Sequence, residues 1–284
     1  MEFRTQVAIQ EPPFRIEPCE EILFVGSCFA DAIGQRFREE AFPVTVNPYG
    51  VMYNPASILH TVEKWKVERE KWKEHTPNMA FLTLGTNHVY RLKETGEIVD
   101  NCEKRPAALF QEELLSVEQC ADYLRQSIDL LHSVNPDIHV VLTVSPIRYR
   151  KYGYHESQLS KATLLLAANQ LVVAVSSTTP AVFPAGSVTY FPAYELILDE
   201  LRDYRFYAAD MLHPSAQAVE YIWERLVDSY FSPAAKDYLA EWRPLKQALA
   251  HKPFNPDSAE YRAFHEQTLS KLAEFKKKYP HLAL

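Results

Sequence analysis

Short apolar runs alternate with longer amphipathic segments between Ile22 and Tyr230. Several of the runs are continuously apolar, which is typical of strands that are buried on both faces of a sheet. Alternation of such strands with helical segments is the pattern of β-α units that build a parallel sheet. The predicted strands are Ile22–Val25, Phe42–Val46, Met79–Leu84, Ile138–Val144 and Ser187–Phe191.

The segments between these strands carry apolar residues at helical spacing. In one of them Ile58, Val62, Trp65 and Trp72 fall on one stripe, so this stretch predicts an amphipathic helix. The predicted crossover helices are Phe29–Glu40, Ile58–His75, Val117–Val134 and Gln158–Val175. Strands joined by such helices predict an α/β protein, a three-layer α/β/α sandwich around a five-stranded parallel sheet.

Two stretches depart from this alternation. Residues Arg91–Leu114 break the period and contain turn-forming residues, so we expect a hairpin or insertion over the end of the sheet. After the predicted helix Pro214–Tyr230 there is no further strand pattern, and helix starts are found at Ser232-Pro233 and at Asn255–Ser258. We therefore expect an α/β domain over residues 1–232 and a helical C-terminal appendage over residues 233–284, packed on the same domain.

The charge balance argues against a nucleic acid as partner. The chain has 30 Lys and Arg residues against 37 Asp and Glu residues, a net charge of −7. Binding to a nucleic acid or an anionic membrane needs clustered Lys and Arg. No signal peptide and no apolar run of about 18 residues, the length of a membrane span, is visible, so we expect a cytoplasmic protein that does not bind a membrane. The four cysteines form no Cys-x-x-Cys pair, so we expect free thiols and no metal site.

The first candidate site follows the first predicted strand, where Gly26 leads into Ser27 and Cys28 at a helix start. In open α/β sheets, ligands bind outside the carboxyl ends of the strands. A thiol in the first turn of a helix also lies among unpaired N–H groups, which favour the thiolate. The alternative is structural: Ser27 caps the helix, and Cys28 is a small buried apolar residue.

The second candidate site follows the third predicted strand, in Gly85-Thr86-Asn87-His88. The side-chain amide of Asn87 can donate a hydrogen bond to a developing oxyanion. The same residues are also ordinary turn formers. A catalytic role for this segment is better supported because it is the second strand end that leads into glycine and polar residues.

The third candidate site is Asp210-Met211-Leu212-His213-Pro214-Ser215, just before a predicted helix. Helix capping alone can explain the proline and the aspartate. It does not explain His213. An aspartate three residues before a histidine on one loop can hold the Nδ1–H of the imidazole and leave Nε2 free as a base.

Together, these segments resemble a known family. The segment Gly26-Ser27-Cys28-Phe29-Ala30 is the signature that names the GSCFA-domain family, and further segments look like shared parts of it: Asn101–Pro106, Thr143–Pro146 and Asp210–Ser215. The resemblance covers nearly the whole chain. That family is similar to the SGNH (GDSL) hydrolases, mostly esterases and acyl hydrolases on a flavodoxin-like sheet, and this implies the same fold here.

The resemblance to the SGNH hydrolases also implies site residues. Cys28 takes the place of the nucleophilic serine, and Ser27 takes that of the preceding aspartate, which is a departure from the pattern. Gly50 would donate its N–H to the oxyanion, and Asn87 would donate its side-chain amide. His88 replaces the aspartate that follows this asparagine. The last block is kept in full as Asp210 and His213.

The resemblance implies an SGNH-like acyl hydrolase acting on an O-acylated carbohydrate or similar small ester through a Cys/Ser-His-Asp site, with no cofactor. Either Cys28 or Ser27 is its nucleophile. His88 and His155 are expected to line the substrate pocket, although a histidine at a helix start, such as His155, also has a structural explanation. Because a thiol nucleophile forms a thioester, which also transfers to amine and hydroxyl acceptors, an acyltransferase stays open. So does a non-catalytic ligand-binding module on the same fold. The sequence leaves the oligomeric state open.

Overall fold

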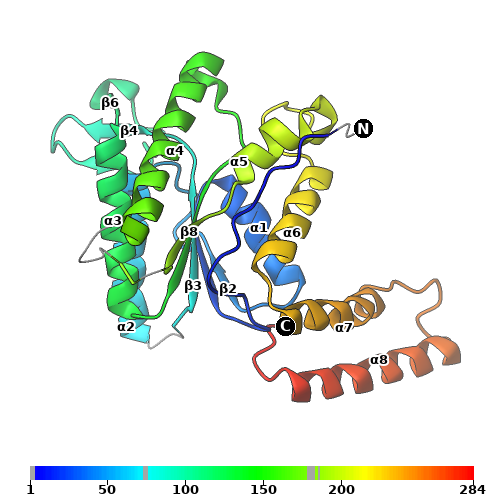
Figure 1. Ribbon diagram of the computed structural model, residues 1–284. Coiled ribbons are helices and arrows are strands. Elements are labelled where there is room, and N and C mark those ends of the chain that lie inside the picture. Colours follow the sequence, from blue (N-terminus) through cyan, green and yellow to red (C-terminus); the bar gives the residue numbers. More distant parts are fainter. Residues whose placement is uncertain (1–3, 73–75, 178–182, 185) are drawn as a thin grey trace.

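The predicted strands form one five-stranded parallel sheet in the computed structural model, which describes residues 4–72, 76–177, 183–184 and 186–284 (Figure 1). The strand order is β2-β1-β3-β7-β8. This is the flavodoxin-like order, so the predicted fold class is confirmed. The strands are β1 (Ile22–Gly26), β2 (Val44–Val46), β3 (Met79–Leu84), β7 (His139–Val144) and β8 (Val188–Tyr190).

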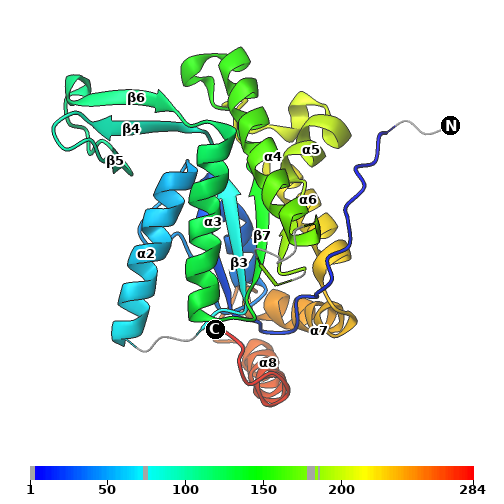
Figure 2. The same ribbon diagram turned by 60° about the vertical axis from the view of Figure 1, so that its left-hand side comes forward.

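Helices cover both faces of the sheet, and the two faces bury separate apolar clusters (Figure 2). Along β1, Ile22 and Phe24 pack on one side, while Leu23 and Val25 pack on the other. This explains why the strands are continuously apolar. The first face is covered by α1 (Cys28–Glu39) and α6 (Ala216–Tyr230), and the second by α2 (Pro55–Trp72), α3 (Val117–Val134) and α4 (Tyr154–Ser177).

Most helix boundaries agree with the sequence pattern to within a few residues. The helix α2 starts earlier than predicted because Asn54 accepts the N–H of Ser57 at 2.9 Å and so caps it. The predicted end of this helix, residues 73–75, lies outside the described residues. The short helical turns are Ala107–Leu109, Arg150–Tyr152, α5 (Ala193–Glu195), Leu196–Leu201 and Tyr204–Phe206.

The predicted insertion is a small antiparallel sheet with strand order β5-β4-β6. Its strands are β4 (His88–Leu92), β5 (Ile98–Val99) and β6 (Phe110–Leu114). It begins at His88, directly after the β3 turn, and therefore three residues earlier than the sequence pattern indicated. Figure 2 shows it extending from the carboxyl edge of the main sheet, the edge that carries the candidate site.

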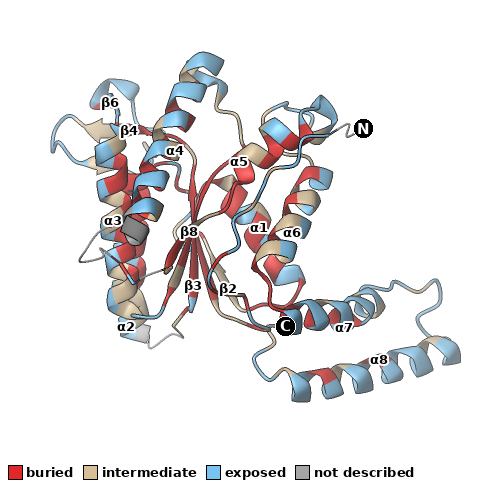
Figure 3. Cartoon of the chain, in the orientation of Figure 1, coloured by how far each residue is buried: buried red, intermediate tan, exposed pale blue. Residues whose placement is uncertain are grey.

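The C-terminal helices α7 (Pro233–Leu249) and α8 (Ala259–Lys278) lie at the opposite, amino edge of the sheet (Figure 1). Tyr238 donates its hydroxyl to the carbonyl of Glu40 at 2.6 Å, and Trp242 donates its indole N–H to that of Glu39 at 3.0 Å. These bonds attach α7 to the end of α1. Most of α8 is exposed, whereas the central strands β1 and β3 are buried (Figure 3). None of the helices within the described ranges is both long and apolar enough to cross a membrane.

Candidate active site

The turn after β1 brings Ser27 and Cys28 to the carboxyl edge of the sheet. Only glycine fits at position 26, because its φ is +147° and a Cβ there would lie 2.2 Å from the carbonyl oxygen of Thr83 on β3. The Gly26 N–H donates to Oδ1 of Asn47 at 2.8 Å. In turn Nδ2 of Asn47 donates to Asp31 at 2.7 Å. The turn is therefore fixed from both sides.

Ser27 and Cys28 have different environments. Ser27 is buried and is the N-cap of α1: its Oγ accepts the N–H of Phe29 at 3.3 Å, and its carbonyl accepts that of Ala30 at 2.7 Å. Cys28 is partly exposed, and its N–H has no hydrogen-bond partner among the described residues. The thiol and a free backbone donor are thus available at the same helix start.

The tyrosine Tyr53, which the sequence analysis did not single out, lies beside this thiol. Its hydroxyl is 3.7 Å from Sγ of Cys28. Burial and the neighbouring thiol raise the pKa of Tyr53 to about 12, so the hydroxyl stays protonated and can donate. Its carbonyl accepts the N–H groups of Gly85 and Thr86 at 2.9 and 2.7 Å, which ties its backbone to the end of β3.

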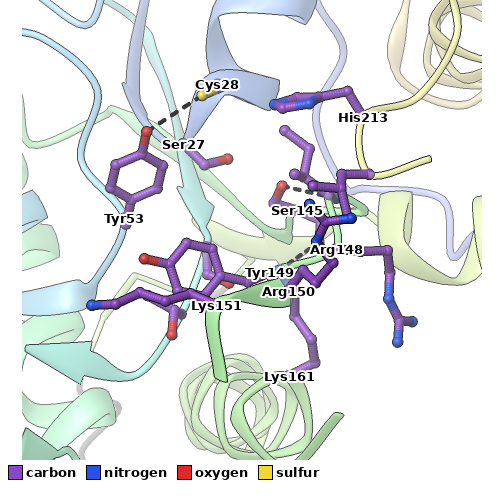
Figure 4. Close-up of a pocket in the computed structure, with 14 residues that line it drawn as sticks. Ser27, Cys28, Tyr53, Ser145, Arg148, Tyr149, Arg150, Lys151, Lys161 and His213 are labelled. Carbon is purple, nitrogen blue, oxygen red and sulfur yellow. Dashed lines mark hydrogen bonds between the residues drawn. The ribbon is translucent and has the colours of Figure 1, made fainter. Parts of the chain in front are cut away.

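Asp210 orients His213 on the loop before α6. The distance from Oδ2 of Asp210 to Nδ1 of His213 is 2.6 Å. Oδ1 accepts the backbone N–H groups of Leu212 and His213 at 2.9 and 3.0 Å. These bonds from the backbone of His213 and Leu212, and then the one from the His213 ring, hold the pKa of Asp210 well below its usual range. The ring therefore keeps Nε2 free, and in Figure 4 it points toward Cys28.

A cavity of about 380 Å³ joins the β1 turn to the His213 loop. The residues that line it come from the carboxyl ends of β1, β3 and β7, from the segment before α2, from α4 and from this loop: Ser27, Cys28, Tyr53, Gly85, Thr86, Ser145, Ile147, Arg148, Tyr149, Arg150, Lys151, Lys161, Leu212 and His213. No hydrogen bond joins Cys28 to His213 in the described part of the chain, so the two residues share the cavity without a direct bond between them.

Lys161 extends from α4 to the bottom of this cavity (Figure 4). It is buried, and its Nζ donates to the carbonyls of Gly85 and Ser145 at 2.6 and 2.8 Å. It thus bridges the ends of β3 and β7. Burial, and then the nearby charge of Arg148, lower the pKa of Lys161 to about 7.

The structure does not support the prediction that Asn87 donates its amide to an oxyanion. Asn87 is buried and does not line the cavity. Its Nδ2 donates to the carbonyl of Leu115 at 2.8 Å, and its backbone N–H donates to Oγ of Ser160 at 2.9 Å. The amide therefore holds the start of α3 against the β3 turn.

Gly50 is also not available as an oxyanion donor. Its N–H donates to the carbonyl of Asn47 at 2.9 Å, within a turn that its φ of +94° allows. The residue is exposed and lies outside the cavity lining. The partly exposed Tyr53, three residues further along, carries the donor that faces Cys28.

The two histidines predicted to bind substrate do not line the cavity. The His88 ring is stacked on Tyr152 with its centroid 3.8 Å away, and its Nδ1 is 3.2 Å from Oε1 of Glu112. Burial lowers the pKa of His88. It therefore connects the insertion to the turn after β7. His155 is exposed in the first turn of α4.

Tyr53, Arg148 and Lys161 are the site residues that sequence reasoning missed. One signal for Lys161 was present in the sequence: it falls at helical spacing between Ser157, Leu164 and Ala168, on the buried stripe of α4. A lysine on such a stripe is rare unless it has buried partners. No corresponding signal marks Tyr53. Among the described residues, no group of three or more His, Cys, Asp or Glu side chains is arranged to hold a metal ion.

Comparisons with known proteins agree with the resemblance found in the sequence. The model of the GSCFA family matches residues 21–76 and 71–226, and that of the C-terminal domain of GSCFA domain proteins matches residues 242–284. No curated protein matches the chain.

Several solved structures resemble the chain in part. A protein from Streptococcus pneumonia, proposed to be a platelet activating factor, is 16% identical over 79% of this chain and 85% of that chain, with a TM-score of 0.46. A proposed GDSL-like lipase from Parabacteroides merdae is 12% identical over 77% of this chain and 98% of that chain, with a TM-score of 0.45. A family 3 carbohydrate esterase from Talaromyces cellulolyticus is 11% identical over 80% and 98% of the two chains, with a TM-score of 0.38.

Proposed function

The chain belongs to the GSCFA family, and from the geometry of its site we propose that it is an acyl hydrolase that cleaves a small ester through Cys28, His213 and Asp210. One observation carries the proposal. A partly exposed thiol at a helix start shares a cavity with a histidine whose Nδ1 is held by a carboxylate. This is the arrangement of an activated nucleophile, a base and a group that orients the base.

In the first step, Nε2 of His213 takes the thiol proton of Cys28, and Sγ attacks the carbonyl carbon of the ester. The tetrahedral intermediate collapses, the C–O bond breaks, and the alcohol leaves with the proton from Nε2. In the second step, His213 takes a proton from water, and the resulting hydroxide attacks the thioester. The acid leaves, and Sγ regains its proton from His213.

Two groups in this site are proposed to hold the oxyanion. The N–H of Cys28 points out of the first turn of α1 without a partner in the described residues. The hydroxyl of Tyr53 is 3.7 Å from Sγ and stays protonated up to high pH. A donor placed where negative charge develops typically contributes about 10²–10³-fold to turnover.

The choice of Cys28 over Ser27 as the nucleophile rests on the hydrogen bonds of the two side chains. Oγ of Ser27 caps α1, so its attack on a substrate would leave the helix start without this bond. The thiol of Cys28 has no such structural role, and its hydrogen-bond partner is the Tyr53 hydroxyl.

The proposed substrate is an O-acylated carbohydrate or a similar small ester. A cavity of about 380 Å³ is in the size range of small-molecule sites. Because Cys28 forms a thioester, a hydroxyl or amine acceptor can replace water in the second step. Acyl transfer is therefore the second candidate function.

Hydrolysis of 4-nitrophenyl acetate by the full chain tests the proposal. We expect turnover by the wild-type protein and a loss of at least about 10³-fold in Cys28→Ala, since the nucleophile is removed. Cys102→Ala is the matched control, because this thiol is also partly exposed but lies in the insertion, outside the cavity. Addition of a sugar or amine acceptor then separates transfer from hydrolysis by product analysis.

Two results would contradict the assignment. Full turnover in Cys28→Ala together with loss in Ser27→Ala would make Ser27 the nucleophile. If the folded wild-type protein turned over neither this ester nor larger ones, the non-catalytic binding module would replace the enzyme.

A further inference from the structure

The cavity next to Cys28 is positively charged, although the chain as a whole carries a net charge of −7. Its lining includes four basic side chains, and no Asp or Glu is among the described residues that form it. The basic residues are Arg148, Arg150, Lys151 and Lys161. An acidic protein whose cavity has only basic residues among its charged lining concentrates positive potential at one place, and such a place attracts anions.

Arg148 is the central member of this group. Its backbone N–H donates to the carbonyl of Leu212 at 3.0 Å, so it lies directly beside the loop that carries His213. Within the described ranges, its guanidinium has no hydrogen bond and no ion pair with a carboxylate. Its Cζ lies 5.8 Å from the centroid of the Tyr154 ring. A half-buried guanidinium with unused donors is suited to bind a carboxylate or a phosphate.

Three carboxylates near the cavity are engaged elsewhere. Asp210 accepts three hydrogen bonds from His213 and Leu212. Asp31 accepts one from Asn47. Glu112 pairs with His88. None of the three carboxylates lines the cavity, so none neutralises Arg148.

The other basic residues differ in how much they contribute. Arg150 is exposed, and within the described residues it forms no ion pair. Lys151 donates to the hydroxyls of Tyr90 and Tyr152. The charged neighbour that acts on Lys161 is a second cation, Arg148. An anion in the cavity would therefore favour the protonated form of Lys161 beside Arg148.

We propose that the ester accepted by this site carries a carboxylate or phosphate, which Arg148 binds next to Cys28 with support from Arg150 and Lys161. The inference rests on the proposed function for its reaction, whereas the anion site itself can be tested without turnover. It makes Arg148 a residue that determines specificity, and it predicts that neutral esters are poor substrates.

The first experiment compares two pairs of esters that differ in charge. Mono-(4-nitrophenyl) glutarate is compared with 4-nitrophenyl butyrate, and 4-acetoxy-3-nitrobenzoate with 4-nitrophenyl acetate. The first pair tests a carboxylate on the acyl group, and the second pair tests one on the leaving alcohol. We expect kcat/KM for at least one anionic ester to exceed that of its neutral partner by about 10–100-fold, the usual effect of a charge-assisted hydrogen bond.

Arg148→Gln should remove this preference, because kcat/KM for the anionic ester should fall to about that of its neutral partner. Arg38→Gln is the control, because it removes the same charge from the exposed end of α1, at the other edge of the sheet. If both anionic esters are hydrolysed no better than their neutral partners, or if Arg148→Gln keeps the preference, the inference is wrong.

The second experiment measures anion binding directly, as protection of Cys28 from iodoacetamide. Inorganic phosphate and succinate are used as separate probes, against sodium chloride at the same ionic strength. We expect at least one probe to slow alkylation in the wild type and in Arg38→Gln, but not in Arg148→Gln. Whichever probe protects identifies phosphate or carboxylate as the preferred group. Equal alkylation rates in all samples would contradict the anion site, and protection without turnover of any ester would contradict only the proposed hydrolysis.

Discussion

The turn after β1 and the turn after β3 lie side by side at the carboxyl edge of the sheet, and both combine a glycine with small polar residues. After β1, Cys28 keeps its thiol and its N–H free of backbone partners and faces the cavity. After β3, the amide of Asn87 bonds the Leu115 carbonyl, and the ring of His88 packs on Tyr152. The first turn presents the thiol of Cys28 to the cavity, whereas the second uses the side chains of Asn87 and His88 inside the protein.

This difference shows that position at a strand end does not by itself give a residue a catalytic role. A buried polar group that has a partner stabilises the fold, and it is free for a substrate only if that bond is broken. We therefore expect loss of the Cys28 thiol to lower activity with little effect on stability. Loss of the Asn87 amide should do the opposite.

The largest expected effect is on activity, in His213→Ala. Loss of the base should lower kcat/KM for an ester by about 10³-fold or more, because neither Cys28 nor the leaving alcohol then has a proton partner. Since the side chain of His213 is 45% exposed, the free energy of unfolding should change little. Steady-state kinetics and urea unfolding measure the two quantities. Activity within tenfold of wild type would exclude His213 as the base.

Tyr53→Phe should have the next largest effect, a decrease of about 10–100-fold in turnover. The substitution removes the hydroxyl that is 3.7 Å from Sγ of Cys28 and keeps the ring. Tyr154→Phe is the control, because Tyr154 is 51% exposed and does not line the cavity. Equal activities in the two variants would remove Tyr53 from the site.

Much of the fold follows from local patterns, whereas the site depends on contacts that local patterns do not contain. The strand β3 was predicted to the residue, because its six positions are all buried and the adjoining residues are turn formers. The bond from Asn87 to Leu115 depends on where the inserted strands return the chain. The approach of Tyr53 to Cys28 depends on how α2 starts, and no periodicity encodes it. Asp210 and His213 could be paired from the sequence because their contact lies within one loop.

Asn87→Ala tests the other half of the comparison. It leaves the buried carbonyl of Leu115 without a donor, so we expect the free energy of unfolding to fall by about 1–3 kcal/mol. Turnover of an ester should stay within about threefold of the wild type, because the amide does not reach the cavity. The exposed Asn169→Ala is the control for stability. A decrease of about 10²-fold in turnover with unchanged stability would restore Asn87 as an oxyanion donor.

The smallest expected effect is a pH dependence of stability that comes from Lys161. Its pKa is lowered from an ordinary value of 10.5 to about 7 in the folded chain. Above about pH 7 the unfolded chain binds a proton that the folded chain has lost, so the free energy of unfolding rises with pH, by at most about 1.4 kcal/mol per pH unit. Unfolding by urea between about pH 7 and pH 8.5 should show this slope.

Lys161→Met should remove the part of the pH dependence of stability that comes from Lys161, because a methionine side chain has no titratable group. The variant also loses two hydrogen bonds to carbonyls, so it should be less stable at every pH. Only the difference in slope between the two proteins reports on the proton. Parallel curves would mean that Lys161 keeps its ordinary pKa in the folded chain.

The central claim is that Cys28 carries the acyl group, and trapping the intermediate tests it most directly. The full chain is mixed with an activated ester, quenched in acid, digested and analysed by mass spectrometry, with and without neutral hydroxylamine. We expect one acyl group on the peptide that contains Ser27 and Cys28, and its removal by neutral hydroxylamine, which cleaves a thioester but spares an oxygen ester. Two results obtained while the ester is turned over would contradict the account. One is an adduct that resists hydroxylamine, and the other is an adduct on Cys102.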